Sequence, residues 1–123
     1  MSEEKPRSEA YRCGQVYAVI EVLQALRPGG GWKLSGEGYR IDTSVTPMTN
    51  LRIAMSEVGK HYIEARLRHP VGEVDKVFGM LRDAMPLKND FPGRLEGEAP
   101  GEFLQGREDQ IALIKKETSL RLR

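Results

Sequence analysis

The stretch Ser8-Glu9-Ala10-Tyr11-Arg12-Cys13-Gly14-Gln15-Val16-Tyr17-Ala18-Val19-Ile20-Glu21-Val22-Leu23-Gln24-Ala25-Leu26 decides the fold of this chain. Its apolar residues include a set with the spacing of one helical face, namely Cys13, Val16, Tyr17, Ile20 and Leu23. Val19, Val22 and Leu26 widen this face, so we expect a central helix. Ser8 can cap its amino end, and Pro28 with the glycine run after it ends the helix.

Three further stretches have helical periodicity. Thr46-Pro47 favours a helix start, and the apolar seam that follows runs to about Leu67. Gly59 lies within this second helix, and close packing against a neighbouring helix would explain a glycine there. The spacing predicts a third helix over residues 72–85 and a last helix from Glu102 to about residue 117.

The remaining segments lack such periodicity. Residues 32–44 contain glycines that interrupt any long element, which favours a Gly-rich loop or a small hairpin between helices one and two. Residues 86–101 form a long Pro/Gly loop, which we expect a partner to order. The prediction is one all-α domain over residues 1–123, a compact four-helix bundle. Residues 1–7 would be a flexible lead-in and residues 118–123 a frayed tail.

No catalytic motif stands out among the 123 residues. Cys13 is the only cysteine and lies on an apolar helical face, which predicts a buried, inert thiol. His61 and Glu64 are spaced to share a metal, but an ordinary surface helix face explains them better, so no metal or cofactor is expected. The chain lacks an amino-terminal apolar run and a membrane-length apolar stretch, which predicts a cytoplasmic protein. Its acidic residues are scattered over predicted solvent faces and do not pair in an apolar setting, so no enzyme is expected.

The remaining chemical signal is basic, although the net charge is only +1. On the second predicted helix, three basic side chains fall on the flank and back of the apolar seam, namely Arg52, Lys60 and Arg68, and Arg66 lies nearer the edge of the seam. Lys115 and Lys116 follow near the end of the last helix, where they also complement the helix dipole. These six residues are the candidates for contacts with a nucleic-acid backbone, and a solvated face of mixed charge is the alternative.

Several of these stretches resemble one family in their order and spacing. Ala10–Glu21 is similar to a segment with Tyr-Arg, a spacer, Gly and then aliphatic residues before Glu. Thr46–Leu51 resembles a Thr-Pro helix start, and His61-Tyr62 falls where the family places His and an apolar residue. Phe103–Gly106 followed by Gln110 resembles a Phe-x-x-Gly-x-x-x-Gln pattern. The family is the C-terminal region of the large subunit of subtype I-C CRISPR surveillance complexes (Cascade), which also occurs as a free small subunit.

The resemblance implies a helical, non-catalytic subunit of a crRNA-guided effector complex. Such a subunit stacks beside the backbone and large subunits in more than one copy. It contacts the backbone of the crRNA–target DNA duplex and the displaced single strand, and it stabilises the R-loop. Two alternatives stay open: an anti-CRISPR-like mimic that occupies the place of that subunit, and a small helical DNA-binding regulator.

Overall fold

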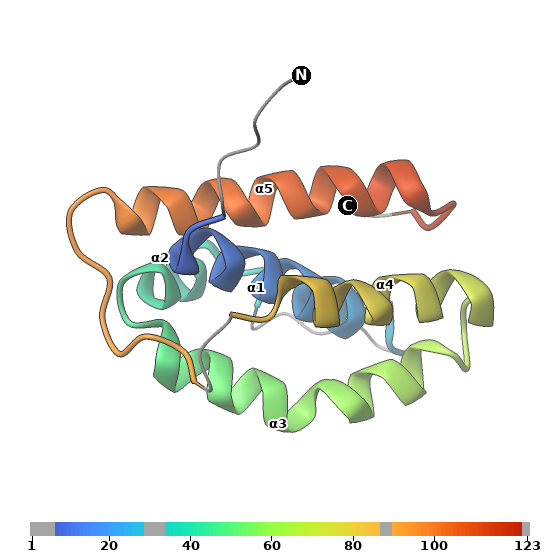
Figure 1. Ribbon diagram of the computed structural model, residues 1–123. Helices are drawn as coiled ribbons and strands as arrows, with labels where there is room; N and C mark the ends of the chain where they lie inside the picture. Colours follow the sequence, from blue (N-terminus) through green and yellow to red (C-terminus); the bar gives the residue numbers. More distant parts are fainter. Residues whose placement is uncertain (1–6, 29–33, 87–89, 122–123) are drawn as a thin grey trace, which may run out of the picture.

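Helix α1 (Glu9–Leu26) runs through the middle of the molecule, with other helices packed around it (Figure 1). The computed structural model describes residues 7–28, 34–86 and 90–121. Within these residues the chain is all helical, and the remaining helices are α2 (Glu37–Val45), α3 (Pro47–Ala65), α4 (Val71–Ala84) and α5 (Ala99–Glu117). The all-α class is therefore confirmed, with five described helices where four were expected.

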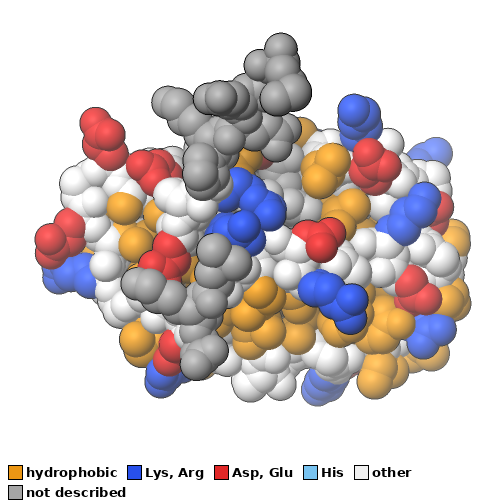
Figure 2. Space-filling view, viewed as in Figure 1, with side chains coloured by type: hydrophobic (Ala, Val, Ile, Leu, Met, Phe, Trp, Pro, Cys, Tyr) orange, Lys and Arg blue, Asp and Glu red, His pale blue; other side chains and the backbone are white. Residues whose placement is uncertain are grey.

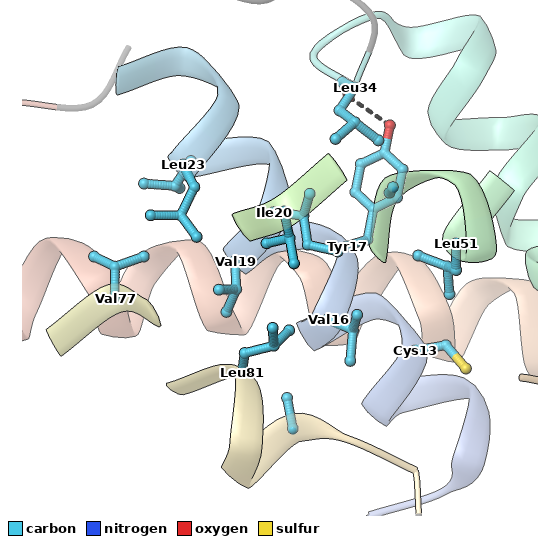
Figure 3. Close-up of a cluster of buried hydrophobic side chains, with 14 of the residues drawn as sticks. Cys13, Val16, Tyr17, Val19, Ile20, Leu23, Leu34, Leu51, Val77 and Leu81 are labelled. Atoms are coloured by element: carbon cyan, nitrogen blue, oxygen red, sulfur yellow. Dashed lines mark hydrogen bonds between the residues drawn. The ribbon is translucent and has the colours of Figure 1, made fainter. Parts of the chain in front are cut away.

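The core is built around α1, because most of its residues are buried on all sides. Figure 3 shows Val16, Val19, Ile20 and Leu23 of α1 meeting side chains from α3 and α4. Tyr17 is fully buried as well, and its hydroxyl donates a hydrogen bond to the backbone carbonyl of Leu34. The expected central role of this helix is confirmed, and α3, α4 and α5 each bury one face against it.

Helices α1 and α5 approach so closely that their backbones touch. A Cβ atom added at Gly14 would overlap the carbonyl oxygen of Phe103, and one at Gly106 would overlap the carbonyl oxygen of Tyr11. Each glycine therefore admits the backbone of the facing helix. Gly59 is different, because a Cβ there would meet nothing within 4 Å, so the expected packing reason for this glycine is wrong.

Helix α2 corrects the prediction of a hairpin or an irregular loop over residues 32–44. Its buried residues are Thr43 and Ser44, so the buried face carries hydroxyl groups rather than an apolar stripe. Both hydroxyls donate to carbonyl oxygens of the same helix, Thr43 to Tyr39 and Ser44 to Ile41, which satisfies them away from water. The Gly29–Lys33 part of this connection lies outside the described residues.

The Pro/Gly loop is anchored to the body over its described part, residues 90–98, without any partner. Phe91 and Leu95 are buried, and the backbone N–H of Leu95 donates to the carbonyl oxygen of Val45 over 2.7 Å. Helix α5 begins at Ala99, three residues before the predicted start. These contacts within the chain position residues 90–98, so the position of this segment does not require the partner that was expected.

The two ends of the chain are also tied to the helices where the structure describes them. Arg7 donates to the carbonyl oxygen of Asp83 at 3.1 Å and to the side chain of Gln15 at 2.9 Å. Leu120 is buried, and the backbone N–H of Ser119 donates to Glu73 at 3.0 Å. The rest of the predicted lead-in and tail, residues 1–6 and 122–123, lies outside the described residues.

Candidate nucleic-acid interface

Of the six basic residues that the sequence singled out, Arg52 and Lys60 lie on helix α3, Arg66 is its carboxyl cap, and Arg68 follows just beyond its end. All four residues are exposed, as predicted for Arg52, Lys60 and Arg68, whereas Arg66 was expected nearer the edge of the apolar seam. The inward face of the helix holds Leu51, Ala54 and Val58, which pack into the core. The amphipathic pattern thus turns the basic groups toward solvent.

Three of these four residues contact an acidic neighbour. Arg52 forms an ion pair with Asp90 of the Pro/Gly loop, and the hydrogen bonds between them raise the pKa of the Arg52 guanidinium. Lys60 lies 4.0 Å from Glu64 one helical turn away, and its side chain is 74% exposed. An exposed pair of this kind contributes at most about 1 kcal/mol, so a phosphate can displace the carboxylate. Lys60 has the longest of these contacts, and Arg68 forms no ion pair with a residue that the structure describes, which makes these two the freer cations.

Lys115 and Lys116 do not join the α3 group. They lie in the last turn of α5, exposed to solvent, and α1 separates α5 from α3 (Figure 1). The six candidates therefore form two groups on different sides of the central helix. A single phosphate backbone that follows α3 does not also follow the end of α5.

An apolar groove of about 600 Å³ opens between α3 and α4, and Figure 2 shows hydrophobic side chains gathered over this region. Its lining includes Met55 of α3 with Phe78 and Leu81 of α4. Arg82 and Asp83 also line it, so the apolar surface borders opposite charges. The groove exists because α3 and α4 both pack on α1 but touch each other only sparingly.

An aromatic pair bridges α3 and α4. The rings of Tyr62 and Phe78 stack with their centroids 4.2 Å apart and their planes at 18°. The guanidinium carbon of Arg66 lies 5.3 Å from the Tyr62 centroid, over the ring. Asp75 of α4 accepts a hydrogen bond from the Tyr62 hydroxyl at 2.7 Å and lies 3.5 Å from Arg66. The sequence indicated only Arg66 as a candidate, because the folded chain is needed to show that Asp75 and Phe78 of α4 lie beside it and Tyr62.

A buried ion pair between α1 and α5 is the charged feature that sequence reasoning missed. Arg107 donates to both carboxylate oxygens of Glu21, at 3.0 and 2.8 Å, and both side chains are nearly buried. Arg40 of α2 approaches the same carboxylate at 3.9 Å. Burial alone would lower the pKa of Arg107, yet the bonds to Glu21 raise it overall. Both members serve helix packing here, since neither is presented to solvent.

Polar contacts continue along the same α1–α5 seam. The Tyr11 hydroxyl donates to Asp109 at 2.5 Å, and burial followed by this hydrogen bond raises the pKa of Tyr11 to about 12. The Gln15 amide donates to Gln110 at 3.2 Å between buried side chains. Each of these hydrogen bonds requires one alignment of α1 along α5, so together they specify how the two helices pair.

His61 and Cys13 lie in the interior rather than at a reactive surface. His61 is 1% exposed, which corrects the expectation of a surface position, and Arg27 donates to its Nδ1 at 3.2 Å. Burial and then the neighbouring Arg27 lower the pKa of His61. Cys13 is fully buried, as predicted, and burial raises the pKa of its thiol to about 12. A thiol held protonated is a poor nucleophile at neutral pH.

The described residues offer fixed positive charge, an aromatic face and an apolar groove, all on or beside α3. Among those residues, no group of three His, Cys, Asp or Glu side chains could hold a metal ion. None of the helices formed by them is long and apolar enough to cross a membrane. No protein-family model and no curated protein sequence matches this chain.

Proposed function

We propose that this chain is a non-catalytic small subunit of a type I CRISPR effector complex, which binds the DNA backbone and the displaced strand and so stabilises the R-loop. One observation carries the proposal. The two stretches that resemble the family at opposite ends of the sequence fold onto each other as the α1–α5 pair. Their shared glycines, Gly14 and Gly106, are the residues that permit this pairing. Proteins that share a fold should share the residues on which the fold depends, so a resemblance at these positions supports the proposal.

The exposed cations on α3 and just beyond its end support a role in binding phosphate. Lys60 and Arg68 offer charge without an arrangement that could read base edges, and a guided complex leaves sequence reading to the RNA. A subunit of this kind needs only positive side chains along the path of the strand. The near-neutral net charge suits a protein whose other faces meet protein neighbours.

Exposed apolar residues support a place inside a larger assembly of backbone and large subunits. Large aliphatic side chains on the surface are Ile41, Ile53, Ile63, Leu67, Val71 and Leu113. Leu67 is 74% exposed and Ile63 is 62% exposed, both beside the basic residues of α3. Ile63 and Leu67 are four residues apart, and adjoining apolar surface is typical of interaction sites in soluble proteins. A lone regulator is less well supported, because the exposed Lys76 and Arg82 of α4 are offset by Asp75 and Asp83, whereas a recognition helix would present a basic face.

Reconstitution tests the proposal directly. A subtype I-C effector complex assembled without its small subunit is mixed with the purified full chain, and binding to a matched target DNA is measured. The chain should co-purify with the complex and restore target binding. Charge reversal at Lys60 and Arg68 should remove the restored binding, whereas Arg94→Glu, at an exposed arginine outside the candidate set, should not.

The same assay separates the subunit from a mimic. A mimic would also co-purify with the complex, but it would abolish the residual target binding instead of restoring it. A chain that neither associates with the complex nor changes its DNA binding would contradict both versions. Circular dichroism of each variant confirms that the helices are intact, so that a lost effect reports on binding rather than folding.

A further inference from the structure

A partly exposed cluster between α3 and α4 combines an aromatic stack with a cation and a carboxylate, and a contact that only packs two helices does not need these groups. Its members are Tyr62, Arg66, Asp75 and Phe78. Both rings are only half-buried, and the Arg66 and Asp75 side chains are 41% and 45% exposed. One face of Tyr62 is covered by Phe78, which leaves the other face to the Arg66 guanidinium. The outer surface of this stack is therefore a flat aromatic face whose cover is a single exposed arginine.

From this geometry we infer that Tyr62 is a stacking platform for an unpaired nucleobase, with Arg66 moving from the ring to the adjoining phosphate. The inference rests on the proposed function and deepens it, because it names where the displaced strand is held. A nucleotide joins a flat aromatic ring to an anion, and the cluster offers the two complementary groups side by side. Aromatic and arginine side chains bind single strands in this way without regard to sequence.

The exchange is feasible because the contacts that hold Arg66 are weak. Its Nε lies 3.5 Å from Asp75 at an exposed position, where an ion pair contributes little to stability. Asp75 keeps its hydrogen bond from the Tyr62 hydroxyl at 2.7 Å when Arg66 leaves, so the ring stays oriented. Phe78 supports the ring from behind, and Arg68 is exposed nearby to meet a second phosphate.

The test uses the full chain and two short oligonucleotides of equal length, an oligothymidylate and its abasic counterpart. NMR titration follows the ring resonances of Tyr62 and Phe78, which respond to a stacked base even when binding is weak. Thymidylate should bind more tightly than the abasic strand and should shift these resonances, while the abasic strand leaves them in place. Tyr62→Leu should weaken thymidylate binding about 5- to 150-fold and leave abasic binding unchanged.

Two variants separate stacking from helix packing. Tyr62→Phe keeps the ring and should retain the preference for thymidylate. Phe78→Leu removes the same intramolecular stack but leaves the outer face of Tyr62, so it should lose less binding than Tyr62→Leu at comparable stability. Equal binding of the two oligonucleotides, ring resonances that do not move, or Tyr62→Leu binding like the wild type would each overturn the platform.

Failure here is distinct from failure of the proposed function. If reconstitution succeeds and the preference for bases is absent, the chain is a subunit that touches only phosphates. If the preference for bases is present and reconstitution fails, the platform stands as a single-strand site and the proposed assembly does not.

Discussion

Gly14 and Gly106 have no room for a side chain, because each faces the backbone of the other helix. A methyl group at either position would overlap a carbonyl oxygen, and a backbone atom cannot swing away as a side chain can. We expect Gly14→Ala and Gly106→Ala each to lower the free energy of unfolding by about 3 kcal/mol or more. Urea unfolding followed by circular dichroism measures the change. Wild-type stability in either variant would show that α1 and α5 do not meet as described.

Gly59 provides the matched opposite case. It lies within α3, is exposed, and would place a Cβ atom in open space. Since glycine costs a helix interior about 1 kcal/mol relative to alanine, Gly59→Ala should raise the free energy of unfolding by about 0.5–1 kcal/mol. Urea unfolding followed by circular dichroism measures this increase as well. A decrease would mean that this position packs against something in the folded chain after all.

His61 should make the fold sensitive to mild acid. Burial and then the nearby Arg27 lower its pKa in the folded protein, while the unfolded value is about 6.5. As the pH falls below about 6.5, the unfolded chain takes up a proton that the folded protein excludes, so stability decreases. His61→Asn offers Arg27 an acceptor without a titrating ring and should flatten this part of the profile. Thermal unfolding of both proteins between pH 5 and 8 measures this difference in pH dependence.

At the scale of elements, the pairing of α1 with α5 depends on charge as well as on glycine. Removing one partner of the Glu21–Arg107 pair leaves a buried charge, so Arg107→Met should cost about 3 kcal/mol, softened by Arg40 at 3.9 Å from the same carboxylate. Replacing both partners, with Glu21→Gln added, should recover part of that loss because the buried carboxylate is then removed, although Arg40 also loses its neighbour. Denaturant titration of both variants measures the difference. A double variant less stable than Arg107→Met would contradict this account.

Apolar periodicity predicted four of the described helices, since α1, α3, α4 and α5 each bury aliphatic side chains at helical spacing. It missed α2 for a physical reason. The residues that α2 buries are Thr43 and Ser44, whose hydroxyls bond to carbonyls of their own helix, so no apolar stripe marks it. The start of α5 was placed late because Pro100 and Gly101 read as loop residues, whereas proline fits the first turn of a helix.

At the scale of the whole molecule, the exposure of most candidate cations could be predicted from the sequence, but their grouping could not. Helical arithmetic places Lys60 and Arg68 outside the apolar seam, and they are exposed. It cannot show that α1 stands between α3 and α5, nor that Asp90 comes from a distant loop to pair with Arg52. It likewise assigned Arg107 no partner, because Glu21 lies 86 residues away in the chain. Contacts of this range are set by the packing of helices rather than by local pattern.

The separation of the two basic groups leads to a prediction about salt. Neutralising a phosphate contact should reduce the slope of log affinity against log salt by about 0.7 for a single strand. If a strand follows α3, Lys60→Gln with Arg68→Gln should reduce that slope for a single strand, and Arg94→Gln should leave it unchanged. Lys115→Gln with Lys116→Gln should have no effect on single-strand binding, because α1 keeps the end of α5 away from α3.

Within the assembled complex, both pairs of substitutions should reduce the slope for R-loop formation, since the two sides of the subunit would then face different strands. Affinity measured at several salt concentrations, with the single strand and with the assembled complex, distinguishes the cases. A single strand that senses both pairs equally would mean that it crosses the molecule over α1 instead of following α3. An R-loop that senses neither pair would mean that the subunit contributes through protein contacts alone, with its charges solvated.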